Sequence, residues 1–114
     1  MSSKLDDYSE RHRNQMNLLV HIAVVPLFVI GLVGGVIALA IGQFAFFGAG
    51  VALVVYSLLM QKWGHAQEAI PPEPFDGLVD FLGRILTEQF VTFPSFVLSG
   101  RWRANFQASN RNPR

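Results

Sequence analysis

The chain has 114 residues, a formal net charge of +1, and 51% hydrophobic but only 15% charged residues, against about 25% charged residues in soluble domains. The near-neutral charge, without a basic stripe carrying interleaved aromatic residues, argues against nucleic acid as a partner. Because the sequence contains no cysteine, disulfides, thiolate nucleophiles, iron–sulfur clusters and cysteine-type zinc sites are excluded, and any metal must be held by histidine and carboxylate groups.

The N-terminal segment, residues 3–15, is polar. Within it, Leu5, Tyr8 and His12 recur at positions i, i+3 and i+7, a spacing that predicts a short amphipathic helix on the membrane surface. Asn14 and Asn17 follow as candidate cap residues, so the surface helix is expected to end there and a second helix to begin.

Residues 14–61 form a stretch of 48 residues without Asp, Glu, Lys or Arg. A membrane-spanning helix needs about 20 apolar residues, so the stretch predicts two such helices, at residues 18–41 and 44–60. Only residues 42–43 separate them, which predicts a tight antiparallel hairpin. Small residues on both helices would let the two backbones approach closely. Five glycines are available for this contact: Gly31, Gly34, Gly35, Gly48 and Gly50.

The hairpin predicts where two histidines lie. Residues at equal depth on the two arms have numbers that average to the centre of the turn, and the mean of 21 and 65 is 43. His21 and His65 are therefore expected at one level, each about 33 Å from the turn at 1.5 Å per residue. Arg11, Arg13 and Lys62 flank only the open end, so both termini are expected on the cytoplasmic side of the membrane.

The C-terminal region follows a proline-rich connector, because three prolines between residues 71 and 74 exclude a helix there. Residues 76–90 resume a helical pattern with charges four apart on one face, as in an interfacial helix. Residues 91–99 are apolar, too short to span a membrane, and divided by Pro94. Residues 78–98 are therefore expected to form either a second hairpin or a re-entrant pair, with Trp102 beyond them as an interface anchor.

The predicted fold is an all-α integral membrane helical bundle. It consists of an N-terminal surface helix, a transmembrane hairpin and a C-terminal pair of shorter interfacial or re-entrant helices, all in one domain over residues 1–107. Residues 108–114 are predicted to be a flexible polar tail. The lipid bilayer is thus an expected partner, while the oligomeric state is left open.

The three histidines of the chain, His12, His21 and His65, all fall near the same membrane level. Ionisable groups inside a membrane are costly and usually have a partner, so we expect these three to form a metal site. Nine residues separate His12 from His21, which would place them on opposite faces of one straight helix, so the chain must bend between them. The alternative is that each histidine is a hydrogen-bonded structural residue.

Glu68 is the candidate carboxylate ligand and catalytic residue. It follows His65 by three residues, so on a helical continuation both side chains share a face. Glu73 and Glu88 are alternates, and a surface-exposed Glu68 is the plainer interpretation. Neutral imidazoles with one carboxylate and open coordination positions favour non-haem Fe(II) and oxygen chemistry.

Three segments carry a family resemblance: YSERHRNQMNLLVHIAVVP from Tyr8, WGHAQEAIPPEPF from Trp63, and EQFVTFPSFVLSG ending at Gly100. With them the chain resembles the family catalogued as domain of unknown function 962, whose fungal members are 2-hydroxy-fatty-acid dioxygenases of the endoplasmic reticulum. The resemblance implies an Fe(II)-dependent oxidation in which a 2-hydroxy fatty acid and O₂ react, the carboxyl carbon is lost, and the chain becomes one carbon shorter. It also implies that His12, His21 and His65 hold the iron. The segment ending at Gly100 resembles the bacterial branch of the family, so the expected location is a bacterial inner membrane.

Three functional hypotheses follow. The first is the iron-dependent lipid dioxygenase acting at the membrane interface. The second is a non-enzymatic membrane protein, an interaction or assembly partner, in which the histidines only hydrogen-bond across the hairpin. The third keeps the fold and the site but changes the substrate, because a fold does not fix a function.

Overall fold

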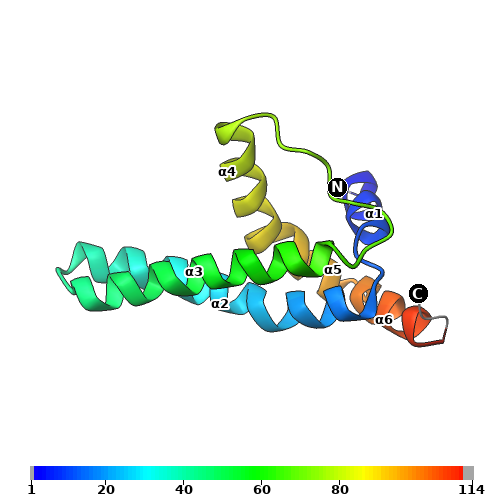
Figure 1. Ribbon diagram of the computed structural model, residues 1–114, viewed down its shortest axis with the longest axis horizontal. Coiled ribbons are helices and arrows are strands. Elements are labelled where there is room, and N and C mark those ends of the chain that lie inside the picture. The colour runs from blue at the N-terminus through cyan, green and yellow to red at the C-terminus, as the bar shows by residue number, and fades with distance from the viewer. Residues whose placement is uncertain (1, 112–114) are drawn as a thin grey trace.

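Two long helices form the central hairpin of the computed structural model, which describes residues 2–111 (Figure 1). Helix α2 spans Gln15–Ala40, helix α3 spans Phe44–His65, and residues 41–43 connect them. Both helices are long and apolar enough to cross a membrane. The predicted hairpin is confirmed, although α3 continues five residues beyond the expected end at residue 60 and so carries His65 on its last turn.

Three of the five predicted small residues make the close contact between α2 and α3. A Cβ atom added at Gly31 would lie 2.7 Å from the backbone oxygen of Gly50, and one added at Gly50 would lie 2.8 Å from the Cα atom of Gly35. Gly34 and Gly48 have no neighbour within 4 Å of such an atom, so they face away from the partner helix. The backbones therefore touch along one face of each helix, as small residues permit.

The N-terminal helix α1, Ser2–Glu10, packs at the open end of the hairpin. Its buried Leu5 and Tyr8 join Leu18 and Val25 of α2 in the main hydrophobic cluster, together with two phenylalanines from the C-terminal region, Phe93 and Phe96. The predicted surface helix is thus present, and its apolar side contributes to the core of the protein at this end.

The C-terminal region is a single bent helical run and not a pair of helices folded back on each other. Helix α4, Leu78–Thr87, continues into the π-helical turn η1, Glu88–Thr92, and then into α5, Phe93–Leu98. The N–H of Phe93 donates to the carbonyl of Glu88, five residues back. This wider turn ends at Thr92, two residues before Pro94, whose ring in a regular α-helix would clash with the carbonyl four residues back. Of the two arrangements expected over residues 78–98, the second hairpin is therefore wrong, and the re-entrant arrangement stays a prediction.

Helix α6, Arg101–Arg111, follows a turn at Gly100 and returns along the open end. The indole N–H of Trp102 donates to the carbonyl of Leu18 at 3.0 Å, and the amide of Asn105 donates to the carbonyls of Ser9 and His12, each at 2.9 Å. Because these contacts hold the helix against α1 and α2, residues 108–111 are helical where the sequence predicted a flexible tail. Residues 112–114 of that tail lie outside the described residues.

The glycine contact predicts a matched pair of stability effects. Gly50→Ala places a methyl group against the backbone of α2, which cannot move aside, so the free energy of unfolding should fall by about 1 to 3 kcal/mol. Gly48→Ala adds the same methyl group in open space and should leave stability unchanged or raise it by up to about 1 kcal/mol. Unfolding in mixed micelles, followed by circular dichroism, measures both. Equal effects of the two substitutions would contradict the described contact.

Candidate metal centre

Three histidines from three separate segments meet at the open end of the hairpin. His12 follows α1, His21 lies on the second turn of α2, and His65 is the last residue of α3. The distances between ring centroids are 4.8 Å for His12 and His21, 4.6 Å for His12 and His65, and 4.8 Å for His21 and His65. One ring nitrogen from each lies within 4.8 Å of the others. The three side chains are therefore close enough to hold a metal ion.

A break in the helix brings His12 to His21. Residues 12–14 are not helical, and the side chain of Asn14 accepts a hydrogen bond from the backbone N–H of Asn17 at 3.1 Å, which caps α2. The bend predicted between His12 and His21 is confirmed. His21 and His65 are brought together by the register of the hairpin, also as predicted.

Hydrogen bonds orient two of the three rings. The Nδ1 atoms of His12 and His21 lie 2.7 and 3.0 Å from the carbonyl oxygens of Tyr8 and Asn17, each four residues back. A carbonyl can only accept, so Nδ1 carries the proton in both rings and Nε2 keeps its lone pair. Metal-ligating histidines usually donate their second ring nitrogen to a carbonyl or carboxylate in this way.

Two buried ring nitrogens have no hydrogen-bond partner, Nε2 of His12 and Nδ1 of His65. Buried polar atoms are nearly always paired, so such atoms need an explanation. Burial, and after it the neighbouring His21 and His65, lower the pKa of His12 well below its usual value, so this imidazole is neutral at pH 7. Unpaired lone pairs on neutral imidazoles are what a bound metal ion requires, and the three histidines fit such an ion.

Aromatic rings enclose the histidines. Tyr8 stacks on His12 with ring centroids 3.7 Å apart, and Phe93 lies 5.9 Å from His21. Phe96 is fully buried and contacts both Tyr8 and His12. Burial, and to a lesser degree the nearby Glu88, raise the pKa of Tyr8, so its hydroxyl stays protonated. The sequence pattern of residues 91–99 does not show that Phe93 and Phe96 belong to this site, because it does not show where that segment packs.

Glu68 lies elsewhere than the sequence predicts. Helix α3 ends at His65 and Glu68 stands in the turn that follows, so the expected helical continuation is wrong. Its carboxylate accepts hydrogen bonds from the backbone N–H groups of Arg13 and Asn14, each at 3.0 Å, and from the amide of Asn17 at 2.6 Å. Glu68 therefore satisfies free donors at the N-terminus of α2. Among the described residues, the cluster with metal-ligand spacing contains only the three histidines.

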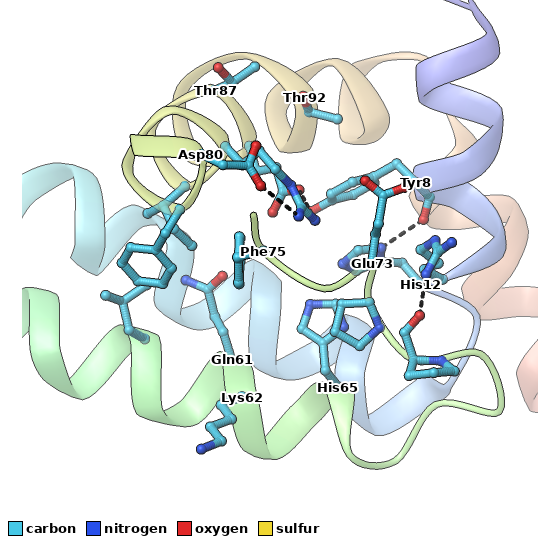
Figure 2. Close-up of a pocket in the computed structure, with 18 of the residues that line it drawn as sticks. Tyr8, His12, Gln61, Lys62, His65, Glu73, Phe75, Asp80, Thr87 and Thr92 are labelled. Carbon is cyan, nitrogen blue, oxygen red and sulfur yellow. Dashed lines mark hydrogen bonds and ion pairs between the residues drawn. The ribbon is translucent and has the colours of Figure 1, made fainter. Parts of the chain in front are cut away.

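A cavity of about 1200 Å³ opens beside the histidines. His12 and His65 line it, and so do the alternate carboxylates Glu73 and Glu88. Figure 2 shows His65 and Gln61 pointing into this space from α3, beneath the connector that carries Glu73 and Phe75. Glu88 also lies 3.9 Å from the guanidinium of Arg84. The ring nitrogens thus adjoin a large space with charged groups on its walls.

Comparisons of the chain with known protein families, with curated proteins and with solved structures find no match. The resemblance to the domain of unknown function 962 family therefore stays a prediction.

Replacing Glu68 and His21 separately tests which groups bind metal. Glu68→Gln keeps the shape of the side chain but weakens the hydrogen bonds to α2, so the free energy of unfolding should fall by about 1 to 3 kcal/mol while the folded protein keeps its metal. His21→Ala should remove the metal from protein that is still folded. Metal content by mass spectrometry, together with helix content, measures both. A folded Glu68→Gln protein without metal would make Glu68 a ligand after all.

Proposed function

We propose that this chain is an Fe(II)-dependent dioxygenase of lipid metabolism, which oxidatively removes one carbon from 2-hydroxy fatty acids at the membrane interface. The supporting observation is the convergence of three imidazoles, those of the buried His12 and His21 and of the half-buried His65, within 4.8 Å of one another. Two of them have a ring nitrogen without another partner. Imidazole ligands suit iron, zinc, copper and nickel. The choice of iron comes from the family resemblance.

The position of the site suits an amphiphilic substrate. With α2 and α3 across the bilayer, the histidines lie at one end of the hairpin, at the boundary between hydrocarbon and water. A 2-hydroxy fatty acid can present its carboxylate and hydroxyl there while its alkyl chain stays in an apolar environment. Arg11 lines the cavity next to His12 and is paired with Asp7 at 3.2 Å, so the substrate carboxylate would have to share its positive charge with Asp7.

The reaction balances with O₂ as the only oxidant. A 2-hydroxy acid, R–CHOH–COOH, and O₂ give R–COOH, CO₂ and water: the bond between C1 and C2 breaks, C2 becomes the new carboxyl carbon, and O₂ takes up four electrons. Bound Fe(II) would supply the open positions at which the carboxylate, the hydroxyl and O₂ are oriented and activated. No further reductant is needed.

The residues of the chain hold and shield this site. The carbonyls of Tyr8 and Asn17 fix the tautomers of His12 and His21, which keeps both Nε2 lone pairs directed at one point. The stacked ring of Tyr8 and the buried rings of Phe93 and Phe96 exclude water from one side. The substrate can then approach only from the side of the cavity that His12 and His65 line.

Oxygen uptake tests the proposal. The iron-loaded protein in lipid nanodiscs should consume one O₂ for each CO₂ released from 2-hydroxyhexadecanoic acid, and none with hexadecanoic acid, which lacks the hydroxyl. His21→Ala should lower the rate by about 100-fold or more, while Gly48→Ala should keep it. Oxygen uptake that persists in His21→Ala, or that needs no 2-hydroxy acid, would refute this function. A stability loss in His21→Ala without turnover in either protein would favour the non-enzymatic alternative.

We also propose that the protein lies in a bacterial inner membrane with both termini in the cytoplasm, because Arg11, Arg13 and Lys62 flank the open end. The cysteine-free sequence makes a direct test simple. In intact cells, a membrane-impermeant maleimide should label Gln43→Cys, at the turn, and should reach Glu10→Cys only after lysis. The reverse pattern would show that the termini lie outside the cytoplasm. Labelling of both cysteine variants in intact cells would rule out a spanning hairpin.

A further inference from the structure

The cavity beside the histidines extends from charged residues past apolar side chains of α3. At one end it is lined by His12, His65 and Arg11. On α3, Leu58 and Leu59 also line it, and they precede His65 by six and seven residues, so they lie about 10 Å closer to the turn of the hairpin. The cavity therefore leads from the charged end of the hairpin toward the part that is expected deeper in the bilayer.

Helix α4 forms the opposite wall and stands apart from the hairpin (Figure 1). None of its residues is buried, and its apolar Val79, Phe81 and Ile85 line the cavity. Arg84 holds α4 to the connector, since its guanidinium donates to the carbonyl of Pro74 at 3.1 Å and lies 4.3 Å from the centre of the Phe75 ring. Polar and charged side chains line the same space: Gln61, Lys62, Asp80, Arg84 and Glu88. The apolar side chains thus form part of the walls between α3 and α4 and do not fill the space.

Gly83, in the middle of α4, also lines this cavity. Glycine is unfavourable inside a helix because it loses more backbone freedom on folding than other residues. Packing does not require it here: a Cβ atom at position 83 would have no neighbour within 4 Å, and the backbone conformation is one that any residue adopts. A side chain at this position would instead reduce the free space in the cavity.

We propose that this cavity holds the alkyl chain of a fatty acid whose carboxyl end lies at the histidines, and that Gly83 sets the length of chain admitted. The identity of the acid headgroup rests on the proposed function, while the placement of the chain rests on the cavity itself. A volume of about 1200 Å³ exceeds the roughly 300–1,000 Å³ of most ligand pockets, as a long chain requires. Lipid is as apolar as the apolar side chains of this cavity, so burial of the alkyl chain alone hardly favours one chain length over another. The shape of the cavity must therefore select the length of the alkyl chain.

Photo-crosslinking tests the proposal without relying on turnover. Hexadecanoic acid with a diazirine at its methyl end is added to the protein in nanodiscs containing Zn²⁺, which has no redox chemistry. Labels should map to the cavity residues Leu58, Leu59 and Val79. Gly83→Trp should reduce this labelling about tenfold, whereas an octanoic acid analogue should label the variant as it labels the wild type.

Matched variants keep the result interpretable. Gly34→Trp is the control, because position 34 has the same open surroundings but lies on the hairpin away from the cavity, and it should label like the wild type. Gly83→Leu, a smaller step, should give intermediate labelling with unchanged helix content. Labels spread over the exposed Phe44 and Phe46 near the turn, or equal labelling in both tryptophan variants, would overturn the assignment.

The two proposals fail separately. Labelling of the cavity that Gly83→Trp abolishes, in a protein without oxygen uptake, would establish the chain site and reject the oxidation. Oxygen uptake on a 2-hydroxy acid, with labels outside the cavity, would establish the oxidation and reject the chain site.

Discussion

The backbone contact between α2 and α3 is the constraint on which the histidine cluster depends. A methyl group at Gly50 would overlap the backbones of Gly31 and Gly35, and one at Gly31 would overlap the backbone of Gly50. A connection of only residues 41–43 joins the helices. A slip of one residue along one helix would rotate a side chain by about 100° and shift it by about 1.5 Å. The contact therefore fixes the register in which His21 and His65 lie side by side.

A second set of contacts brings His12 to the other two histidines. Glu68, just beyond α3, binds the N-terminus of α2, and a side chain at Gly64 would overlap that of Asn17. Asn105 of α6 donates to the carbonyl of His12 itself. These contacts join the start of α2, the segment just beyond α3, and α6 at the place where the chain bends. They hold the bend, so that the ring of His12 faces those of His21 and His65.

The sequence predicted the features that depend on local periodicity and on simple geometry. An uncharged stretch of 48 residues contains only one short break, so the hairpin, its turn and the equal level of His21 and His65 followed from counting residues. The bend after His12 followed from the nine-residue spacing and from Asn14.

What the sequence did not predict depends on contacts between distant segments. The spacing of His65 and Glu68 suggested a shared face only if α3 continued, and the donors that bind Glu68 lie more than 50 residues away along the chain. The π-helical turn before Pro94 has no sequence signal of its own, so the continuous helical run of residues 78–98 was missed. The packing of α6 through Trp102 and Asn105 is equally non-local.

The central claim is that three imidazoles of this chain hold one metal ion. X-ray absorption spectroscopy at the iron edge, on protein purified in detergent and loaded with Fe(II), tests it most directly. The account predicts one iron per chain with the multiple-scattering signature of three imidazole ligands, unchanged in Glu68→Gln. An iron site whose nearest atoms are oxygens without imidazole, or a protein that binds no iron while its helices are intact, would contradict it.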